Sequence, residues 1–188
     1  MKRYNFIIMA SLLAWAAALL GPPAPAEAGS KERREARALR KEGMKQLRNG
    51  NHPGALGALE ESYRLVPRTE LLYHIGVCQQ EMMLYVEAIS SFKRFLDDGG
   101  GEGGSSKRRM GERARAAIAE LEAQIGRIRV VDAPDGAEVL LDGMPVGQTP
   151  ITEPIPADPG LHLLDANLAG YEPFTADVEV PAGGEVVL

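Results

Sequence analysis

The sequence feature that most constrains the fold is an internal period of 33 residues between positions 30 and 125. Equivalent positions in the two units carry similar residues: Gly43 and Gly76, Leu39 and Leu72, Ala55 and Ala88, and Leu59 and Phe92. A period of this length is typical of solenoids, in which each unit buries its apolar face only against its neighbours. Because Ala, Leu, Glu, Arg and Lys dominate this stretch, the units are expected to be helical. The period therefore predicts stacked helical pairs.

Apolar spacing and breaker residues divide this half of the chain into five predicted helices. They cover residues 31–49, 54–66, 69–82, 85–97 and 105–125. The last helix follows a glycine-rich segment, 99–104, which we interpret as a flexible linker because no Lys-Ser/Thr pair follows it as in a phosphate-binding loop. Ser105 or Ser106 is expected to cap the beginning of this helix, and Gly126 its end.

Each unit has a small residue in its first helix, an Ala in its second and a large apolar residue four positions later. These residues are Gly43, Ala55, Leu59 and a closing Pro67 in the first unit, and Gly76, Tyr85, Ala88 and Phe92 in the second. The pattern resembles the tetratricopeptide repeat (TPR), a helix-turn-helix unit of about 34 residues. The first unit departs from it at His52, and the second lacks the closing Pro. The resemblance implies a short α-helical solenoid that is capped by the last helix or completed by a partner.

In such an array the first helix of each unit lines a concave, ligand-binding face. The candidate protein-binding residues on this face are Arg37, Arg40, Met44, Arg48, Tyr73, Val77 and Gln80. Arginines beside Met and Tyr side chains suit an acidic or C-terminal peptide, which they would hold by charge-assisted hydrogen bonds. Met44 stands where relatives that clamp a peptide carboxylate carry an Asn, so a solvated, unoccupied groove stays open as the alternative.

A change of composition at residue 126 predicts a domain boundary. Residues 29–125 hold 17 Lys/Arg and 14 Asp/Glu, a net of +3, whereas residues 126–188 hold 2 Arg and 11 Asp/Glu, a net of −9. The second segment contains short β-branched and alternating runs separated by turn residues such as Asp142-Gly143, which is typical of a small β-sandwich. We therefore predict α + β in separate domains: helical repeats with a capping helix over 29–125, then a β-sandwich over 126–188.

The β segment carries a collinear series of short motifs. They are Pro134-Asp135-Gly136-Ala137, Val139, Leu141-Asp142-Gly143, Gly147, Thr149-Pro150, Pro159-Gly160-Leu161-His162 and Gly170-Tyr171. This series resembles the PEGA domain, named for a Pro-Glu-Gly-Ala motif, with Asp135 as a mild departure from the Glu. The resemblance implies a β-sandwich module of surface and envelope proteins without known catalysis. The motif glycines are expected to serve turns and close backbone approach rather than chemistry.

The N-terminus has the three-part pattern of a secretory signal peptide. Met1-Lys2-Arg3 supplies the positive segment, residues 6–20 form the apolar run, and Ala26-Glu27-Ala28 offers small residues for cleavage after Ala28. The run is short for a membrane span, which needs roughly 20 apolar residues. We predict a signal peptide over 1–28, secretion across the inner membrane to the periplasm or cell surface, and no membrane span after cleavage. An uncleaved N-terminal anchor stays open as the alternative.

The sequence predicts neither a catalytic residue nor a cofactor or metal site. The one cysteine, Cys78, stands four residues after His74, but two ligands do not make a zinc site. Asp132, Asp135 and Asp142 lack the spacing of an EF-hand calcium loop. No Ser lies in a G-x-S-x-G setting, so a hydrolase is not expected. Mixed charges along the helices argue against nucleic-acid binding, which favours a basic stripe with aromatic residues.

These features favour an exported, non-enzymatic scaffold or adaptor. The helices would bind an envelope protein or peptide, and the PEGA-like module would anchor to another envelope or surface component. The alternative is a cell-wall or surface-glycan binding module in the β domain, for which Tyr171 and Phe174 are the available aromatic side chains. Because the sequence ends at Leu188 inside a predicted strand, a continuation of the chain is also an expectation. The partner's identity and the oligomeric state stay open.

Overall fold

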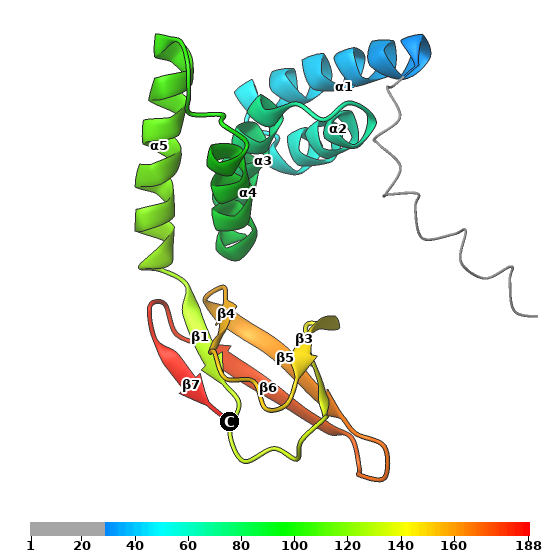
Figure 1. The fold of residues 1–188 in the computed structure, drawn as a ribbon, viewed down its shortest axis with the longest axis vertical. Helices are drawn as coiled ribbons and strands as arrows, with labels where there is room; N and C mark the ends of the chain where they lie inside the picture. Colours follow the sequence, from blue (N-terminus) through cyan, green and yellow to red (C-terminus); the bar gives the residue numbers. More distant parts are fainter. Residues whose placement is uncertain (1–28) are drawn as a thin grey trace, which may run out of the picture.

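The structure, a computed structural model, describes residues 29–188 as five helices followed by seven strands (Figure 1). The helices are α1 (Ser30–Arg48), α2 (His52–Leu65), α3 (Thr69–Glu81), α4 (Tyr85–Asp97) and α5 (Ser105–Glu122). The predicted fold class, a helical domain followed by a small β domain, is confirmed. The signal peptide expected over residues 1–28 lies outside the described residues. None of the described helices combines the length and hydropathy of a membrane span.

The 33-residue period corresponds to a repeated contact between paired helices. A Cβ atom placed on Gly43 of α1 would lie 2.8 Å from the Leu59 side chain of α2, and one on Gly76 of α3 would lie 2.8 Å from the Phe92 ring of α4. Each glycine therefore allows a large side chain of the second helix to approach the backbone of the first. Ala55 and Ala88 are fully buried in the two pairs, which also keeps the helices close.

This contact predicts opposite effects for two glycine substitutions. Gly76→Ala is expected to destabilise the protein by about 1–3 kcal/mol, because the new methyl group would overlap the Phe92 ring. Gly57→Ala in α2 is the matched control, since a Cβ there meets no atom within 4 Å. It should stabilise the protein by roughly 0.5–1 kcal/mol through helix propensity alone. Urea denaturation of both variants measures the difference, and two changes of the same sign would contradict it.

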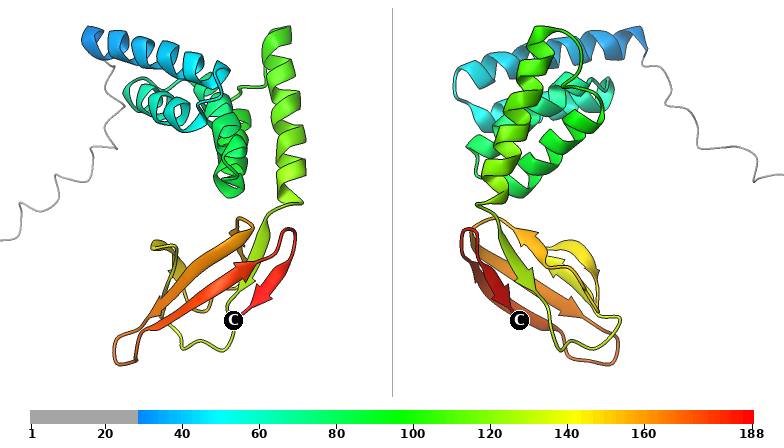
Figure 2. Two further views of the ribbon diagram at one scale, coloured as in Figure 1. Left: turned by 180° about the vertical axis from the view of Figure 1, so that it is seen from behind. Right: turned by 60° about the vertical axis from the view of Figure 1, so that its left-hand side comes forward.

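The fifth helix lies beside α4 and leads into the β half (Figure 2). Its first residue is Ser105 and its N-cap is Gly104, so the expected serine cap is wrong. The helix ends at Glu122, and Gly126 is the first residue of β1 rather than a C-cap. Gly126 is needed there because a side chain would collide with Val180 and with the Pro181 carbonyl oxygen.

The beginning of the predicted glycine linker is packed against the helices. Gly100 is buried, its amide donates to the Phe95 carbonyl oxygen at 2.9 Å, and a Cβ on it would overlap the Phe95 ring. The backbones of Gly101 and Gly111 approach so closely that a Cβ on Gly111 would lie 2.7 Å from the other Cα atom. These glycines therefore let α5 dock close to the end of α4.

The β half is a sandwich of two sheets with a shared core. Its strands are β1 (Gly126–Arg129), β2 (Glu138–Leu141), β3 (Met144–Gln148), β4 (Ile155–Ala157), β5 (Gly160–Asn167), β6 (Phe174–Val180) and β7 (Glu185–Val187). One sheet has the order β4-β1-β7, with β1 and β7 parallel, and the other has the order β3-β2-β5-β6. Ile128 of the first sheet and Val139 and Leu164 of the second are almost completely buried in this core.

The motif between β1 and β2, Pro134 to Ala137, is hydrogen-bonded to Thr149. The Gly136 amide donates to the Thr149 carbonyl oxygen at 2.8 Å, and the Thr149 amide donates to the Ala137 carbonyl oxygen at 2.9 Å. The Thr149 hydroxyl accepts from the Ala137 amide at 2.9 Å and donates to the Pro134 carbonyl oxygen. The motif thus satisfies backbone groups where the chain enters β2.

Candidate partner-binding surfaces

Five arginines surround a groove of about 420 Å³ on the helical half. This arginine groove is lined by Arg33, Arg34, Arg37, Arg40 and Arg68, with Ala36, Ser62 and Val66 at its base. The Ser62 hydroxyl donates to the Ala36 carbonyl oxygen at 2.8 Å, which fixes α2 against α1 at the base of the groove. Small residues at the base and long cationic residues at the rim make a shallow site that suits an anionic ligand.

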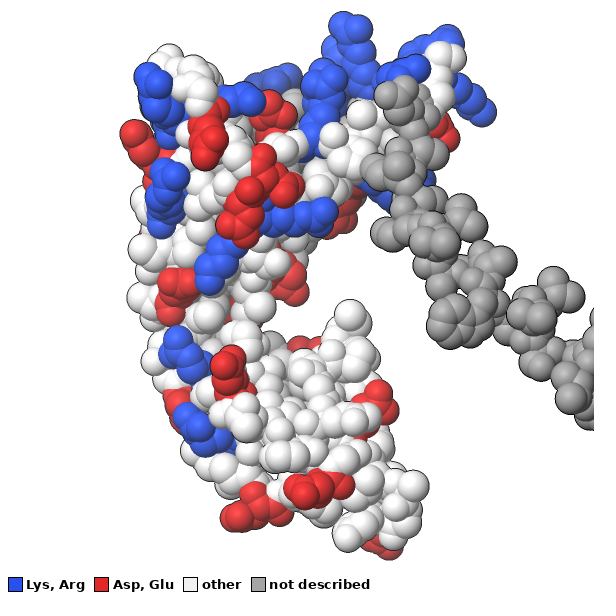
Figure 3. Space-filling view, viewed as in Figure 1, with Lys and Arg blue, Asp and Glu red and all other residues white. Residues whose placement is uncertain are grey.

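The groove arginines are available for an external partner. Arg33, Arg34, Arg37 and Arg68 are exposed, and Arg40 is half-buried. Within residues 29–188 none of them lies within ion-pair distance of a carboxylate. Figure 3 shows Lys and Arg side chains gathered over α1, whereas the visible face of the β half is mainly uncharged, with scattered acidic side chains and a few basic ones along one edge. An acidic segment would therefore meet its strongest attraction at α1.

The structure brings only two of the sequence-predicted site residues into this groove, Arg37 and Arg40. The other predicted residues lie elsewhere. Met44 packs against the core between α1, α2 and α3, and Tyr73 and Val77 pack against the core of α3, α4 and α5. Arg48 is exposed at the end of α1, and Gln80 is half-buried near the end of α3. Their role in binding stays a prediction.

Sequence reasoning missed three of the arginines that line the groove. Arg33 and Arg34 precede Arg37 by four and three residues, so helical spacing alone could have placed them on the same side of α1. Arg68 lies in the α2–α3 connection directly after Pro67, and no local pattern links it to α1.

A second groove, of about 270 Å³, lies on the β half and is mainly apolar. This aromatic groove is flanked by Tyr171 and Phe174, whose exposed fractions are 63% and 51%. Leu168 and Val131 contribute to its apolar lining. The two aromatic residues named from the sequence therefore lie at one site, in and beside the β5–β6 hairpin. This hairpin points away from the helical half in all three ribbon views (Figures 1 and 2).

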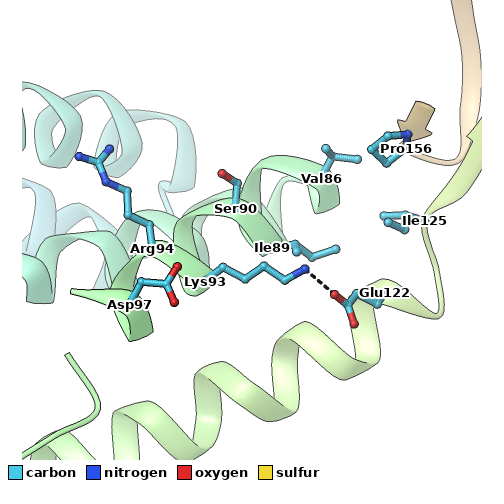
Figure 4. Close-up of a pocket in the computed structure, with 9 residues that line it drawn as sticks. All are labelled: Val86, Ile89, Ser90, Lys93, Arg94, Asp97, Glu122, Ile125 and Pro156. Carbon is cyan, nitrogen blue, oxygen red and sulfur yellow. Dashed lines mark ion pairs between the residues drawn. The ribbon is translucent and has the colours of Figure 1, made fainter. Parts of the chain in front are cut away.

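A third groove, of about 450 Å³, runs between α4 and α5 and is closed at one end by Pro156 of β4 (Figure 4). Val86, Ile89 and Ile125 form its apolar wall. An ion pair crosses it, with Lys93 Nζ at 2.7 Å from Glu122 Oε1. Because these charges neutralise each other across the groove, the pair serves to join α4 to α5.

Cys78 and His74, which the sequence places four residues apart, both lie in environments typical of structural residues. Cys78 is fully buried, and burial raises the pKa of its thiol to about 11, so the reactive thiolate is scarce at neutral pH. Burial also lowers the pKa of His74, whose ring packs edge-on against Tyr73. Among residues 29–188 there is no cluster of three or more potential metal ligands.

Comparison with protein families identifies the β half. A family model described as the PEGA domain matches residues 125–188, which confirms the resemblance and places its start one residue before the expected boundary. The match covers all seven strands and does not extend over α1 to α5. No curated protein matches the chain.

Proposed function

We propose that the protein is a non-catalytic adaptor of the bacterial envelope. Its TPR-like helices bind an acidic segment of a partner protein in the arginine groove, and its PEGA domain attaches to a second envelope or surface component. The convergence of five arginines that form no ion pair within residues 29–188 carries this proposal. Guanidinium groups bind carboxylates by paired, charge-assisted hydrogen bonds, so an extended Asp- or Glu-rich segment is the complementary ligand.

Two further observations support the adaptor. The repeated contacts of Gly43 with Leu59 and of Gly76 with Phe92 agree with the close helix pairing of TPR units. The PEGA match at residues 125–188 suggests a surface or extracellular binding module, which supports export to the periplasm or cell surface. A protein with one binding surface on each half would hold two partners together.

A peptide-binding measurement tests the helical half of the proposal. Residues 29–188 are titrated into a fluorescein-labelled peptide rich in Asp and Glu, and fluorescence anisotropy is followed. We expect saturable binding that weakens as the salt concentration rises, because exposed charges are screened. A peptide of the same length with Asn and Gln in place of the acids is the control. Equal binding of both peptides, or no binding of either at low salt, would overturn the proposal.

The second candidate function is recognition of cell-wall or surface glycan by the aromatic groove. The observation that favours it is the placement of Tyr171 and Phe174 on one apolar groove, because sugar rings stack on exposed aromatic faces. A pull-down on isolated cell-wall material tests it with the wild-type chain and with Tyr171→Ala/Phe174→Ala. Retention of the wild type and loss of the variant would support the glycan function.

A further inference from the structure

The first turn of α4 is capped by a side chain from the β half. The residue at its N-cap position is Leu84, which has no side-chain acceptor. Asp158, between β4 and β5, takes this role: its Oδ1 accepts hydrogen bonds from the Tyr85 amide at 2.8 Å and the Val86 amide at 2.9 Å. A helix leaves its first amides without intrahelical acceptors, and its N-terminus favours negative charge. The contact therefore joins the halves across more than 70 residues of sequence.

His162 holds this capping residue in place. Its Nε2 lies 2.7 Å from the carbonyl oxygen of Asp158, and its Nδ1 lies 2.6 Å from Oδ2 of Asp142 in the β2–β3 turn. The other oxygen of Asp142 accepts the Leu163 amide at 2.9 Å. Only 13% of the His162 side chain is exposed, so its ring is fixed between these two oxygens.

Both ring nitrogens of His162 thus face oxygen acceptors. A neutral imidazole has one N–H donor and one lone pair, so one of its nitrogens would oppose an oxygen without a proton between them. The protonated ring donates to both oxygens. The carboxylates that act on the ring are Asp142 and Asp158, one on each side, and both favour the cation.

We propose that Asp142, His162 and Asp158 form a proton-linked clamp, in which protonated His162 positions Asp158 on the first turn of α4 and loss of the proton loosens the β half from that helix.

The direction of the pH dependence follows from the environment of the ring. Burial opposes the charge of His162, but the Asp142 hydrogen bond, the Asp158 carbonyl oxygen and the two carboxylate charges outweigh it and raise its pKa. Because the pKa of His162 is raised, its protonation stabilises the clamp fully at pH values below the ordinary histidine pKa. This stabilisation is lost as the pH rises through the raised pKa. The pKa of Asp142 is lowered: burial opposes its charge, but the Leu163 amide and His162 prevail, so it stays ionised over this range.

A second contact between the halves contains no titratable side chain. The Gly183 amide, in the β6–β7 turn, donates to the Gln124 carbonyl oxygen at 2.9 Å beside the end of α5. This hydrogen bond stays in place when His162 loses its proton. Opening of the clamp is therefore a movement of the β half about the chain near Gln124, not a separation of the halves.

Hydrogen exchange of the Tyr85 and Val86 amides tests the clamp, because Asp158 is their acceptor in the structure. Exchange is followed by NMR from pH 5.5 to 8.5 on residues 29–188 and corrected for the intrinsic rate. We expect protection to fall about fivefold across this range, the equivalent of ~1 kcal/mol for an N-cap. The Leu71 amide, which donates to the Arg68 carbonyl oxygen in the first turn of α3, is the internal control and should keep constant protection.

Two variants separate the clamp from a general loss of stability. His162→Gln should remove the pH dependence, and Asp142→Asn should keep it but move its midpoint to lower pH, because the ring loses one carboxylate. Constant protection of Tyr85 and Val86 in the wild type would overturn the proposal, as would unchanged pH dependence in His162→Gln. If that variant does not fold, the wild-type midpoint is compared with the His162 titration seen by NMR, and disagreement between them is equally decisive.

Discussion

Replacing Phe92 with alanine is expected to lower the free energy of unfolding by about 3–5 kcal/mol. The side chain is only 1% exposed, and its ring lies 5.8 Å from the Tyr73 ring, centroid to centroid. Its loss would leave a cavity beside Gly76, which has no side chain to fill it. Domains of this size are stable by roughly 5–15 kcal/mol, so the change should move the urea midpoint of the helical signal substantially.

The control for this substitution is Phe174→Ala, which removes the same number of atoms from a half-exposed site. Its cost should be well below that of Phe92→Ala, because water already covers much of its ring. Circular dichroism at 222 nm during urea unfolding follows both variants. Equal midpoints for the two variants would show that Phe92 is not central to the helical core.

Reversing two charges in the arginine groove should weaken binding of an acidic peptide at least about 100-fold. The change is Arg37→Glu with Arg40→Glu, which replaces two attractive groups of the groove lining by repulsive ones. A hydrogen bond to a charged group contributes ~1.5–3 kcal/mol, and ~1.4 kcal/mol is a tenfold change in affinity. Arg37 is exposed and Arg40 is half-buried, and neither belongs to the buried core, so the fold should be retained.

The matched control reverses two exposed arginines of α5, Arg109→Glu with Arg113→Glu, which do not line the groove. Both double variants change the net charge by the same amount, so long-range attraction falls equally. Anisotropy titrations at one salt concentration compare them. A similar loss of affinity in both would show that net charge, and not the groove, holds the peptide.

Much of the fold could be predicted because its strongest contacts repeat in the sequence. Gly43 and Leu59 recur as Gly76 and Phe92, and the structure shows each pair in contact. The short strand β4 has no strand pattern in the sequence, because Pro156 stands at its centre and Pro removes a backbone donor. It is tolerated there because β4 is at the edge of its sheet.

The binding surfaces were only partly predictable, because they depend on contacts between distant segments. Arg37 and Arg40 follow from helix spacing, but Arg68 reaches the groove only after α2 folds back on α1. Tyr73 and Val77 were assigned to a ligand face because TPR-like periodicity places them there, and the structure shows them partly buried against the core of α3, α4 and α5. Helical periodicity identifies which side a residue occupies and does not tell which element covers that side.

The cap that Asp158 supplies to α4 also limits how this protein could have been assembled by domain shuffling. A PEGA domain from another source, joined at residue 125, would leave the first turn of α4 without an acceptor unless it carried a carboxylate at the equivalent position. A duplicated helical pair inserted before α5 would likewise separate Asp158 from the α4 amides that it accepts. The two modules are therefore expected to be inherited as a unit, with substitutions at Asp158 and at the start of α4 occurring together.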